Sequence, residues 1–274
     1  MKLKIFIVVV AVVVAWVAGR GIKSAGQGLV ASVQQEAQNE TQGGSSEQRI
    51  NESFALNEDA RVDVQGINGP VTVEAIDGNT AEVRIVSTAG SAGDLAGQRL
   101  TVEHTDSSLV IRGKGNHNGG FWKWMRGGGE VRHAVVLRLP RRVVLATRGT
   151  NGKVIIGDME GAVQVSGVNG RVEIGRADGG AEVSGVNGGV TVTILELGAK
   201  DMKVNGVNGS VELRLGGNLN ADLNANGVNG SLTIEAPNVE VQEQKRSKLR
   251  ARIGTGGAGI KVNGVNGGVR IVGV

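Results

Sequence analysis

Seven Asn-Gly pairs in this chain share one local pattern. Each follows a small or β-branched residue, and a valine or leucine stands two residues after its glycine. Five of them lie inside a complete Gly-Val-Asn-Gly, and the spacings from the second pair to the sixth are 18, 18, 21 and 21 residues. Such a period is typical of repeat proteins, in which each unit buries its apolar side chains only against its neighbours. The seven asparagines are Asn68, Asn151, Asn169, Asn187, Asn208, Asn229 and Asn266.

Aligning the repeats on their asparagines produces four apolar columns with polar columns between them. Before each Asn-Gly stand Val163 and Val165, Ala181 and Val183, Met202 and Val204, Leu223 and Ala225, and Ile260 and Val262. After it stand Val172 and Ile174, Val190 and Val192, Val211 and Leu213, Leu232 and Ile234, and Val269 and Ile271. Alternation of this kind predicts strands that bury one face.

These columns predict an all-β fold, a single-chain β-solenoid similar to a β-helix, with rungs of 18–21 residues. The alternative is an antiparallel meander or β-sandwich, because Asn-Gly is also the strongest hairpin turn signal. A hairpin sheet needs a second layer, and no helical segment after residue 50 offers one. In the solenoid, neighbouring strands are parallel and the turn asparagines stack as a ladder: Asn151, Asn169, Asn187, Asn208, Asn229 and Asn266.

The first 23 residues are typical of an export signal. Lys2 and Lys4 form a positive start, and the 14 residues from Ile5 to Ala18 are uncharged and apolar. This run is short for a bilayer span and typical of a signal-peptide core. Because the cleavage site is poor, two alternatives stay open: a cleaved signal peptide, or a retained hydrophobic helix that serves as a short N-terminal membrane anchor. Either way, we expect the rest of the chain outside the cytoplasm.

Two further segments follow the leader. Residues 24–49 are rich in Gln, Ser, Gly, Glu and Asn and poor in large apolar residues, which predicts a disordered linker. Residues 50–274 hold the strand patterns and the repeats, and we assign them to one β-solenoid domain.

The composition excludes several classes of function. The chain has no cysteine, so disulfides, thiolate metal sites and cysteine nucleophiles are excluded. The net charge is +4, of which Lys2 and Lys4 supply half, and so balanced a domain argues against a nucleic-acid partner. The three histidines, His104, His117 and His133, have no metal-binding spacing, and we expect no cofactor.

Several of these segments also resemble a known family. Leu139-Pro140, then Thr150-Asn151-Gly152-Lys153-Val154, then the repeated Gly-Val-Asn-Gly, and finally Gly254–Gly257 before Ile260 are similar to the bacterial putative-adhesin domain family of unknown function. Gly66-Ile67-Asn68 resembles the related head-GIN putative adhesins. The resemblance covers residues 50–274. It implies an exported or surface-exposed β-solenoid, and it brings no catalytic residues.

Two departures from the repeat pattern are candidate binding sites. The first is a glycine-flanked aromatic segment with Phe121, Trp122, Lys123, Trp124 and Arg126. Tryptophan beside cations suits a membrane interface or a sugar-stacking surface. The alternative is a flap that caps the open end of the solenoid.

The second candidate is a cationic segment in the long insertion between Asn229 and Asn266. Five cations lie there within eight residues: Lys245, Arg246, Lys248, Arg250 and Arg252. They suit contact with anionic lipid headgroups or cell-wall polymer. The alternative is a solvated strand edge that prevents aggregation.

The sequence thus favours a non-enzymatic binding or scaffold module, adhesin-like, on the periplasmic or extracellular side of the cell envelope. Its expected partners are an anionic membrane surface, a cell-wall polymer or another envelope protein. An accessory sensor of envelope stress is the first alternative. A carbohydrate-active β-helix enzyme is the second, and it needs clustered acids in a groove, whereas the acids here recur with the repeats. The sequence does not decide the oligomeric state.

Overall fold

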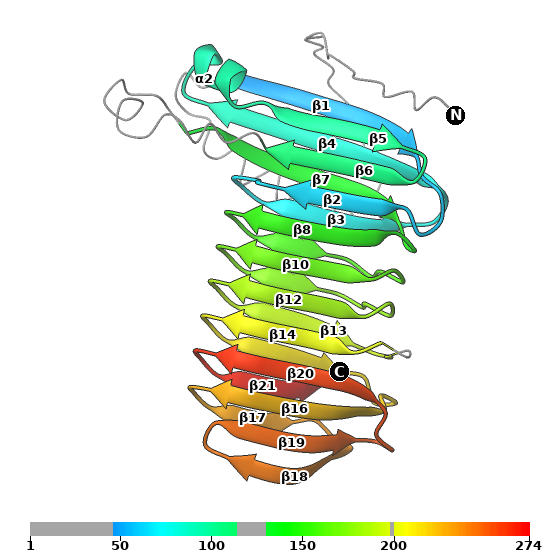
Figure 1. The fold of residues 1–274 in the computed structure, drawn as a ribbon, viewed down its shortest axis with the longest axis vertical. Helices are drawn as coiled ribbons and strands as arrows, with labels where there is room; N and C mark the ends of the chain where they lie inside the picture. Colours follow the sequence, from blue (N-terminus) through cyan, green and yellow to red (C-terminus); the bar gives the residue numbers. More distant parts are fainter. Residues whose placement is uncertain (1–45, 114–129, 198–199) are drawn as a thin grey trace.

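The computed structural model describes residues 46–113, 130–197 and 200–274. In this part of the chain the fold consists almost entirely of strands, which form two large mixed sheets of ten and eleven strands (Figure 1). One short helix, α2 (Ala92–Gly97), lies at one end of the molecule. The prediction of an all-β fold is confirmed.

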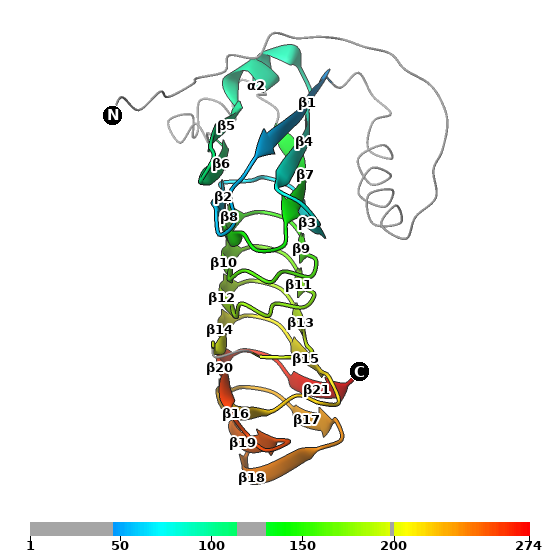
Figure 2. The same ribbon diagram turned by 90° about the vertical axis from the view of Figure 1, so that its right-hand side faces the viewer.

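The two sheets run along the whole length of the molecule and face each other (Figure 2). The ten-stranded sheet contains, in spatial order, β1 (Ser46–Ala55), β4 (Thr80–Ala89), β7 (Arg132–Pro140), β3 (Val71–Ile76), β9 (Val154–Ile156), β11 (Val172–Ile174), β13 (Val190–Ile194), β15 (Val211–Leu215), β21 (Val269–Gly273) and β17 (Leu232–Glu235). The eleven-stranded sheet contains β18 (Val239–Lys245), β19 (Lys248–Ile253), β16 (Ala221–Val228), β20 (Ala258–Val265), β14 (Met202–Val207), β12 (Ala181–Val186), β10 (Val163–Val168), β8 (Val144–Thr150), β2 (Arg61–Gln65), β6 (Ser108–Gly113) and β5 (Leu100–Thr105).

From β8 to β15 the chain alternates between the sheets. Each repeat places one strand in the eleven-stranded sheet, turns at its Asn-Gly pair, and places the next strand in the ten-stranded sheet. Equivalent residues of neighbouring repeats pair in parallel, so Val165 lies opposite Val183 and Val172 lies opposite Val190. Because the two strands that flank each Asn-Gly pair belong to different sheets, these pairs do not form β-hairpins.

The core lies between the sheets and is built from the apolar columns. Val165, Val183 and Val204 stack directly on one another, and each has 0% of its surface exposed. Each such side chain contributes about 1.5–3 kcal/mol by burial, before the entropy of ordering is subtracted. The alternating polar residues, such as Thr191, lie on the outer faces.

The first glycine of each Gly-Val-Asn-Gly bends the end of the strand just before the chain turns at the Asn-Gly pair. Gly167 has φ of +63°, and the equivalent glycines of the other repeats have φ between 62° and 65°. This left-handed conformation costs other residues about 1–2 kcal/mol. The twist there interrupts the alternation of the strand, so Val165 and Val168 both point into the core.

The repeats do not stack in sequence order. Strands β20 and β21, formed by residues 258–273, lie between the repeat of β14 and β15 and the repeat of β16 and β17. The backbone N–H of Val274 donates to the carbonyl of Leu215 at 2.9 Å and holds the end of this segment in place. Repeat spacing alone did not predict this insertion.

Antiparallel elements close both ends of the parallel array. At one end β4 pairs with β7 and β1 pairs with β4, while β5 and β6 form a hairpin in the other sheet. Phe54 of β1 stacks on His104 of β5, with ring centroids 4.2 Å apart. At the opposite end, β18 and β19 form a hairpin on β16. Repeat arrays require such end caps, because an open end leaves apolar side chains exposed.

Two segments differ from the sequence predictions, and a third lies outside the described residues. Strand β1 begins at Ser46, so the assignment of residues 46–49 to the linker is wrong. Helix α2 was not predicted; it begins after Ser91, whose Oγ accepts a hydrogen bond from the backbone N–H of Asp94. The predicted leader, with its hydrophobic helix, and the linker up to residue 45 lie outside the described residues.

Candidate functional site

The turn asparagines form one hydrogen-bonded column along the edge of the molecule. Each Nδ2 donates to the Oδ1 of the asparagine in the neighbouring repeat. The distance is 2.9–3.0 Å in the first five bonds and 3.2 Å in the last one, from Asn229 to Asn266. The column runs Asn68, Asn151, Asn169, Asn187, Asn208, Asn266 and Asn229.

Two features of this ladder were not expected from the sequence. Asn68 belongs to it, and its Nδ2 closes that end by donating to the Val131 carbonyl at 2.8 Å. Asn266 lies ahead of Asn229 because its repeat is inserted. Each interior amide uses one N–H and its oxygen to join the repeats on both sides, so the ladder is a structural device that links neighbouring turns.

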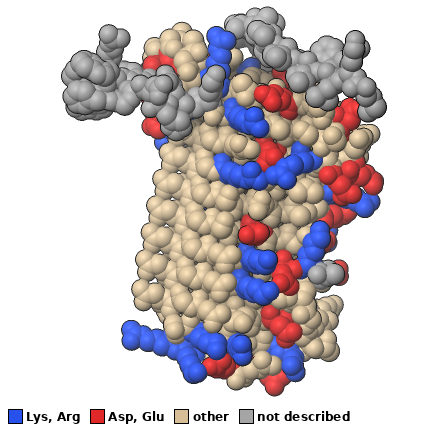
Figure 3. Space-filling view, in the orientation of Figure 1, with Lys and Arg blue, Asp and Glu red and all other residues tan. Residues whose placement is uncertain are grey.

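The outer face of the eleven-stranded sheet divides into regions of different charge (Figure 3). Next to the ladder it is broad and uncharged, because Ser166, Ser184, Asn205, Asn263 and Asn226 lie opposite one another on successive strands. Lys and Arg side chains form a band across the upper half of the view and lie again at the end of the face where β18 and β19 lie. This end holds the cationic segment found in the sequence.

The cationic segment forms hairpin β18–β19. Strand β19 alternates buried Leu249, Ala251 and Ile253 with outward Lys248, Arg250 and Arg252. Arg246 stands in the turn, and Lys245 ends β18, which is the edge strand of the sheet. The hairpin carries five cations and two acids, Glu240 and Glu243. The fold therefore brings the five predicted cations onto one terminal feature.

Pairing removes only part of this positive charge. Glu243 accepts from Lys245 at 2.7 Å and from Lys248 at 2.8 Å, and these ammonium groups lower its pKa to about 2. Arg252 lies 3.9 Å from Asp222. Arg246 and Arg250 form no ion pair with any residue that the structure describes. Two guanidinium groups at this end are therefore free to meet an anion.

The aromatic candidate cannot be placed beside the hairpin. Phe121, Trp122, Lys123, Trp124 and Arg126 all lie outside the described residues. Their role as a contact site or as a flap stays a prediction from the sequence.

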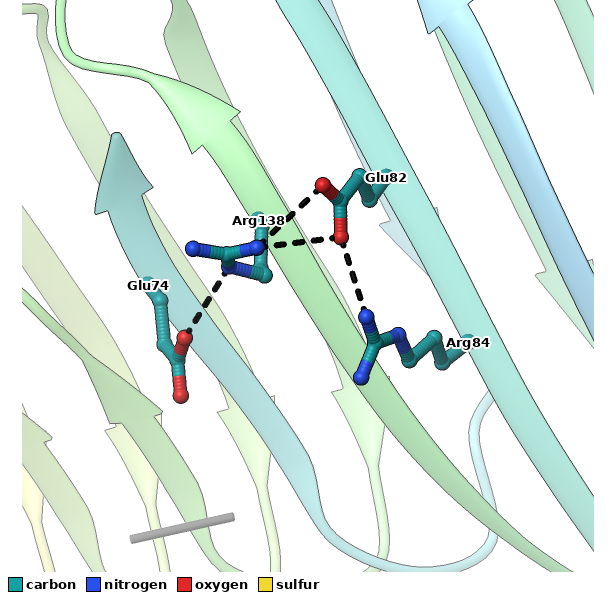
Figure 4. Close-up of polar contacts among 4 residues, drawn as sticks. All are labelled: Glu74, Glu82, Arg84 and Arg138. Atoms are coloured by element: carbon teal, nitrogen blue, oxygen red, sulfur yellow. Dashed lines mark hydrogen bonds and ion pairs between the residues drawn. The ribbon is translucent and has the colours of Figure 1, made fainter. Parts of the chain in front are cut away.

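An ion-pair cluster on the ten-stranded sheet was missed in the sequence (Figure 4). Arg138 of β7 lies 3.4 Å from Glu74 of β3 and 3.2 Å from Glu82 of β4, and Arg84 also pairs with Glu82 at 3.2 Å. These contacts cross the point where parallel pairing changes to antiparallel pairing. These ion pairs could be predicted only from the register of β3, β4 and β7, which the sequence does not show. Partly exposed pairs of this kind contribute about 0–1 kcal/mol each, so the cluster adds little to the stability of the fold.

Ser87 and His133 form a buried polar pair at the junction of β4 and β7. Ser87 Oγ lies 2.9 Å from His133 Nδ1, and the two residues are 6% and 4% exposed. Serine and histidine can together act in acyl transfer, but the hydroxyl must reach a substrate. Burial denies that access in this geometry, so the pair fits a packing role. Desolvation lowers the pKa of His133.

This shift predicts a stability that depends on pH. The pKa of His133 is lower in the folded state than the unfolded value of about 6.5, so the unfolded chain binds more protons near that pH. Stability is therefore expected to fall as the pH drops from about 7.5 to 5.5. Urea unfolding at a series of pH values measures this change in the free energy of unfolding. His133→Gln should flatten the pH dependence of the stability, and an unchanged slope in this variant would refute the assignment.

Two kinds of feature are absent from the described residues. These residues contain no group of three or more His, Cys, Asp or Glu side chains that could hold a metal ion. None of the helices in this part of the chain is long and apolar enough to cross a membrane.

Comparisons with known proteins find likeness in structure only. No family model matches the sequence, and no curated protein matches it. A "putative cell adhesion protein" from Clostridium sporogenes is 13% identical, with a TM-score of 0.43 over 83% of this chain and 100% of its own. A "putative adhesin" from Bacteroides fragilis is 12% identical, with a TM-score of 0.30 over 84% of this chain and 98% of its own. The names of these two structures both refer to adhesion.

A third structure carries a different name. A "putative lipid binding protein" from Parabacteroides distasonis is 12% identical, with a TM-score of 0.27 over 85% of this chain and 98% of its own.

Proposed function

We propose that this chain is an exported, non-enzymatic β-solenoid that binds an anionic surface of the cell envelope through hairpin β18–β19. The observation that carries the proposal is the pair of free guanidinium groups, Arg246 and Arg250, at one end of an otherwise balanced molecule. Arginine suits this role because its planar fork binds phosphate and carboxylate oxygens in pairs.

The repeat geometry supports the scaffold part of the proposal. Parallel strands in register, joined by a ladder of amides, make a stiff rod that holds the hairpin at a fixed distance from the opposite cap. The predicted export signal supports a place outside the cytoplasm, anchored by residues 1–23 or released from them. A sensor of envelope stress is the alternative, and it requires a dedicated protein partner.

The test is co-sedimentation of the protein with vesicles that contain phosphatidylglycerol and with isolated cell wall. Each surface cation near an anionic membrane contributes about 1 kcal/mol, so Arg246→Gln with Arg250→Gln should weaken binding about thirtyfold. Raising the salt concentration should weaken binding of the wild type as well. Trp122→Ala with Trp124→Ala tests the aromatic segment in the same assay.

The matched control removes two cations elsewhere. Arg171 stands just before β11 and Arg214 lies in β15, and they pair with Glu173 and Glu212. Arg171→Gln with Arg214→Gln lowers the net charge equally and should leave binding nearly unchanged. If both double variants lose the same amount of binding, the effect of charge is nonspecific. A wild type that binds neither material would favour the protein-partner alternative.

A further inference from the structure

The fold protects its Asn-Gly pairs unequally. Asparagine followed by glycine deamidates readily, because glycine has no side chain to hinder attack by its own backbone nitrogen. The described residues contain ten such pairs, and in nine of them the asparagine or the glycine is at least partly buried. Asn229-Gly230 is the pair in which both residues are exposed.

Asn229 is also the last member of the ladder. An interior asparagine such as Asn208 donates to one neighbour and accepts from the other, both at 3.0 Å. Asn229 donates to Asn266 at 3.2 Å, the longest bond of the ladder, and its own Oδ1 accepts no hydrogen bond from any described residue. The side chain of Asn229 therefore needs to break only one bond before its Cγ can turn toward the glycine nitrogen.

Three other Asn-Gly pairs lie inside strands rather than at the turns. Asn205, Asn263 and Asn226 belong to β14, β20 and β16 and are partly buried. Each is paired in register with a strand on both sides. The glycine nitrogen can attack the asparagine side chain only if the backbone rotates, and this rotation would break the sheet pairing. Sheet pairing therefore also protects these three pairs from deamidation.

We propose that Asn229 is a site of spontaneous deamidation, and that the hydrogen-bonded ladder protects its other asparagines from the same reaction. Water is the only co-reactant.

The reaction converts the side-chain amide of Asn229 into a carboxylate and releases ammonia. The backbone nitrogen of Gly230 attacks Cγ of Asn229 and forms a C–N bond, while the side-chain nitrogen takes up the amide proton and leaves as ammonia. One water molecule then opens the succinimide at either carbonyl. The products are aspartate or isoaspartate at position 229, each with one new negative charge.

This charge arises beside the cationic hairpin. The backbone N–H of Val228 donates to the carbonyl of Ser247 at 3.2 Å, and Ser247 stands in the turn between Arg246 and Lys248. A carboxylate at position 229 thus lowers the positive potential of that turn. Any effect on binding rests on the proposed function, whereas the deamidation itself does not.

The chain contains a matched internal control. Residues 206–210 and 227–231 have the same sequence, Gly-Val-Asn-Gly-Ser, but Asn208 is interior and Asn229 is terminal in the ladder. The protein is incubated in mildly alkaline water enriched in heavy oxygen, digested, and analysed by mass spectrometry. We expect Asn229 to deamidate about tenfold faster than Asn208 in the folded protein, and both to react at the same rate in urea.

Comparable rates at the two sites in the folded protein would overturn the proposal. A second variant moves the end of the ladder. Asn229→Ser leaves Asn266 as the terminal asparagine, so the rate at Asn266 should rise while the rate at Asn187 stays constant. An unchanged rate at Asn266 would contradict protection by the ladder.

Discussion

Val190→Asp is expected to destabilise the fold by about 4 kcal/mol or more, because it buries a carboxylate that has no partner. Val190 is 1% exposed and stacks between Val172 and Val211 in the core of the parallel array. The next residue, Thr191, faces outward between Glu173 and Glu212. Thr191→Asp should therefore cost only about 0.5–1 kcal/mol, through repulsion by those two glutamates.

Urea unfolding followed by circular dichroism measures both variants. Thr191→Lys is the second control, because a cation between the two glutamates should be neutral or slightly stabilising. If Val190→Asp fails to fold while both Thr191 variants fold, the assignment of faces still stands. Equal losses for Val190→Asp and Thr191→Asp would show that the faces are reversed.

Gly188→Ala is expected to cost about 3–5 kcal/mol, through backbone strain together with a steric clash. Gly188 has φ of +157°, and a Cβ on it would lie 2.3 Å from the carbonyl oxygen of Gly170 in the neighbouring repeat. The backbones of the two repeats are fixed by sheet pairing and cannot move apart locally.

Gly185→Ala is the matched control within the same Gly-Val-Asn-Gly. Gly185 has φ of +62°, but the nearest atom to its Cβ would be the Gly167 nitrogen at 3.6 Å, an ordinary contact. Only the conformational cost of about 1–2 kcal/mol applies there. The midpoint temperature of thermal unfolding should be much lower for Gly188→Ala than for Gly185→Ala. The reverse order would refute the role of close backbone approach.

The repeating part of the fold could be predicted because the same residue pattern recurs several times in the sequence. A valine column such as Val165, Val183 and Val204 can be read from spacing alone, and its burial follows from alternation. Asn68 was visible as a pair but not as a ladder member, since 83 residues separate it from Asn151. The intervening strands have no repeat to align.

The candidate sites were predicted less completely. The five cations could be found because they lie within eight residues of one another in the sequence, and the hairpin then explains which of them are paired. Glu74, Glu82 and Arg138 come from three strands whose register depends on tertiary pairing. The pair of Ser87 and His133 is hidden for the same reason, since 46 residues separate its members.

The inserted repeat separates the order of synthesis from the order of assembly. A ribosome releases residues 202–215 and then 221–235, but residues 258–273 take the place between them and emerge later. Units up to β15 can dock one after another as the chain appears. Strands β16 and β17 cannot pair with β20 and β21 until residues 258–273 are free. Completion of this end is therefore a late step with long-range contacts, and such steps are slow in folding.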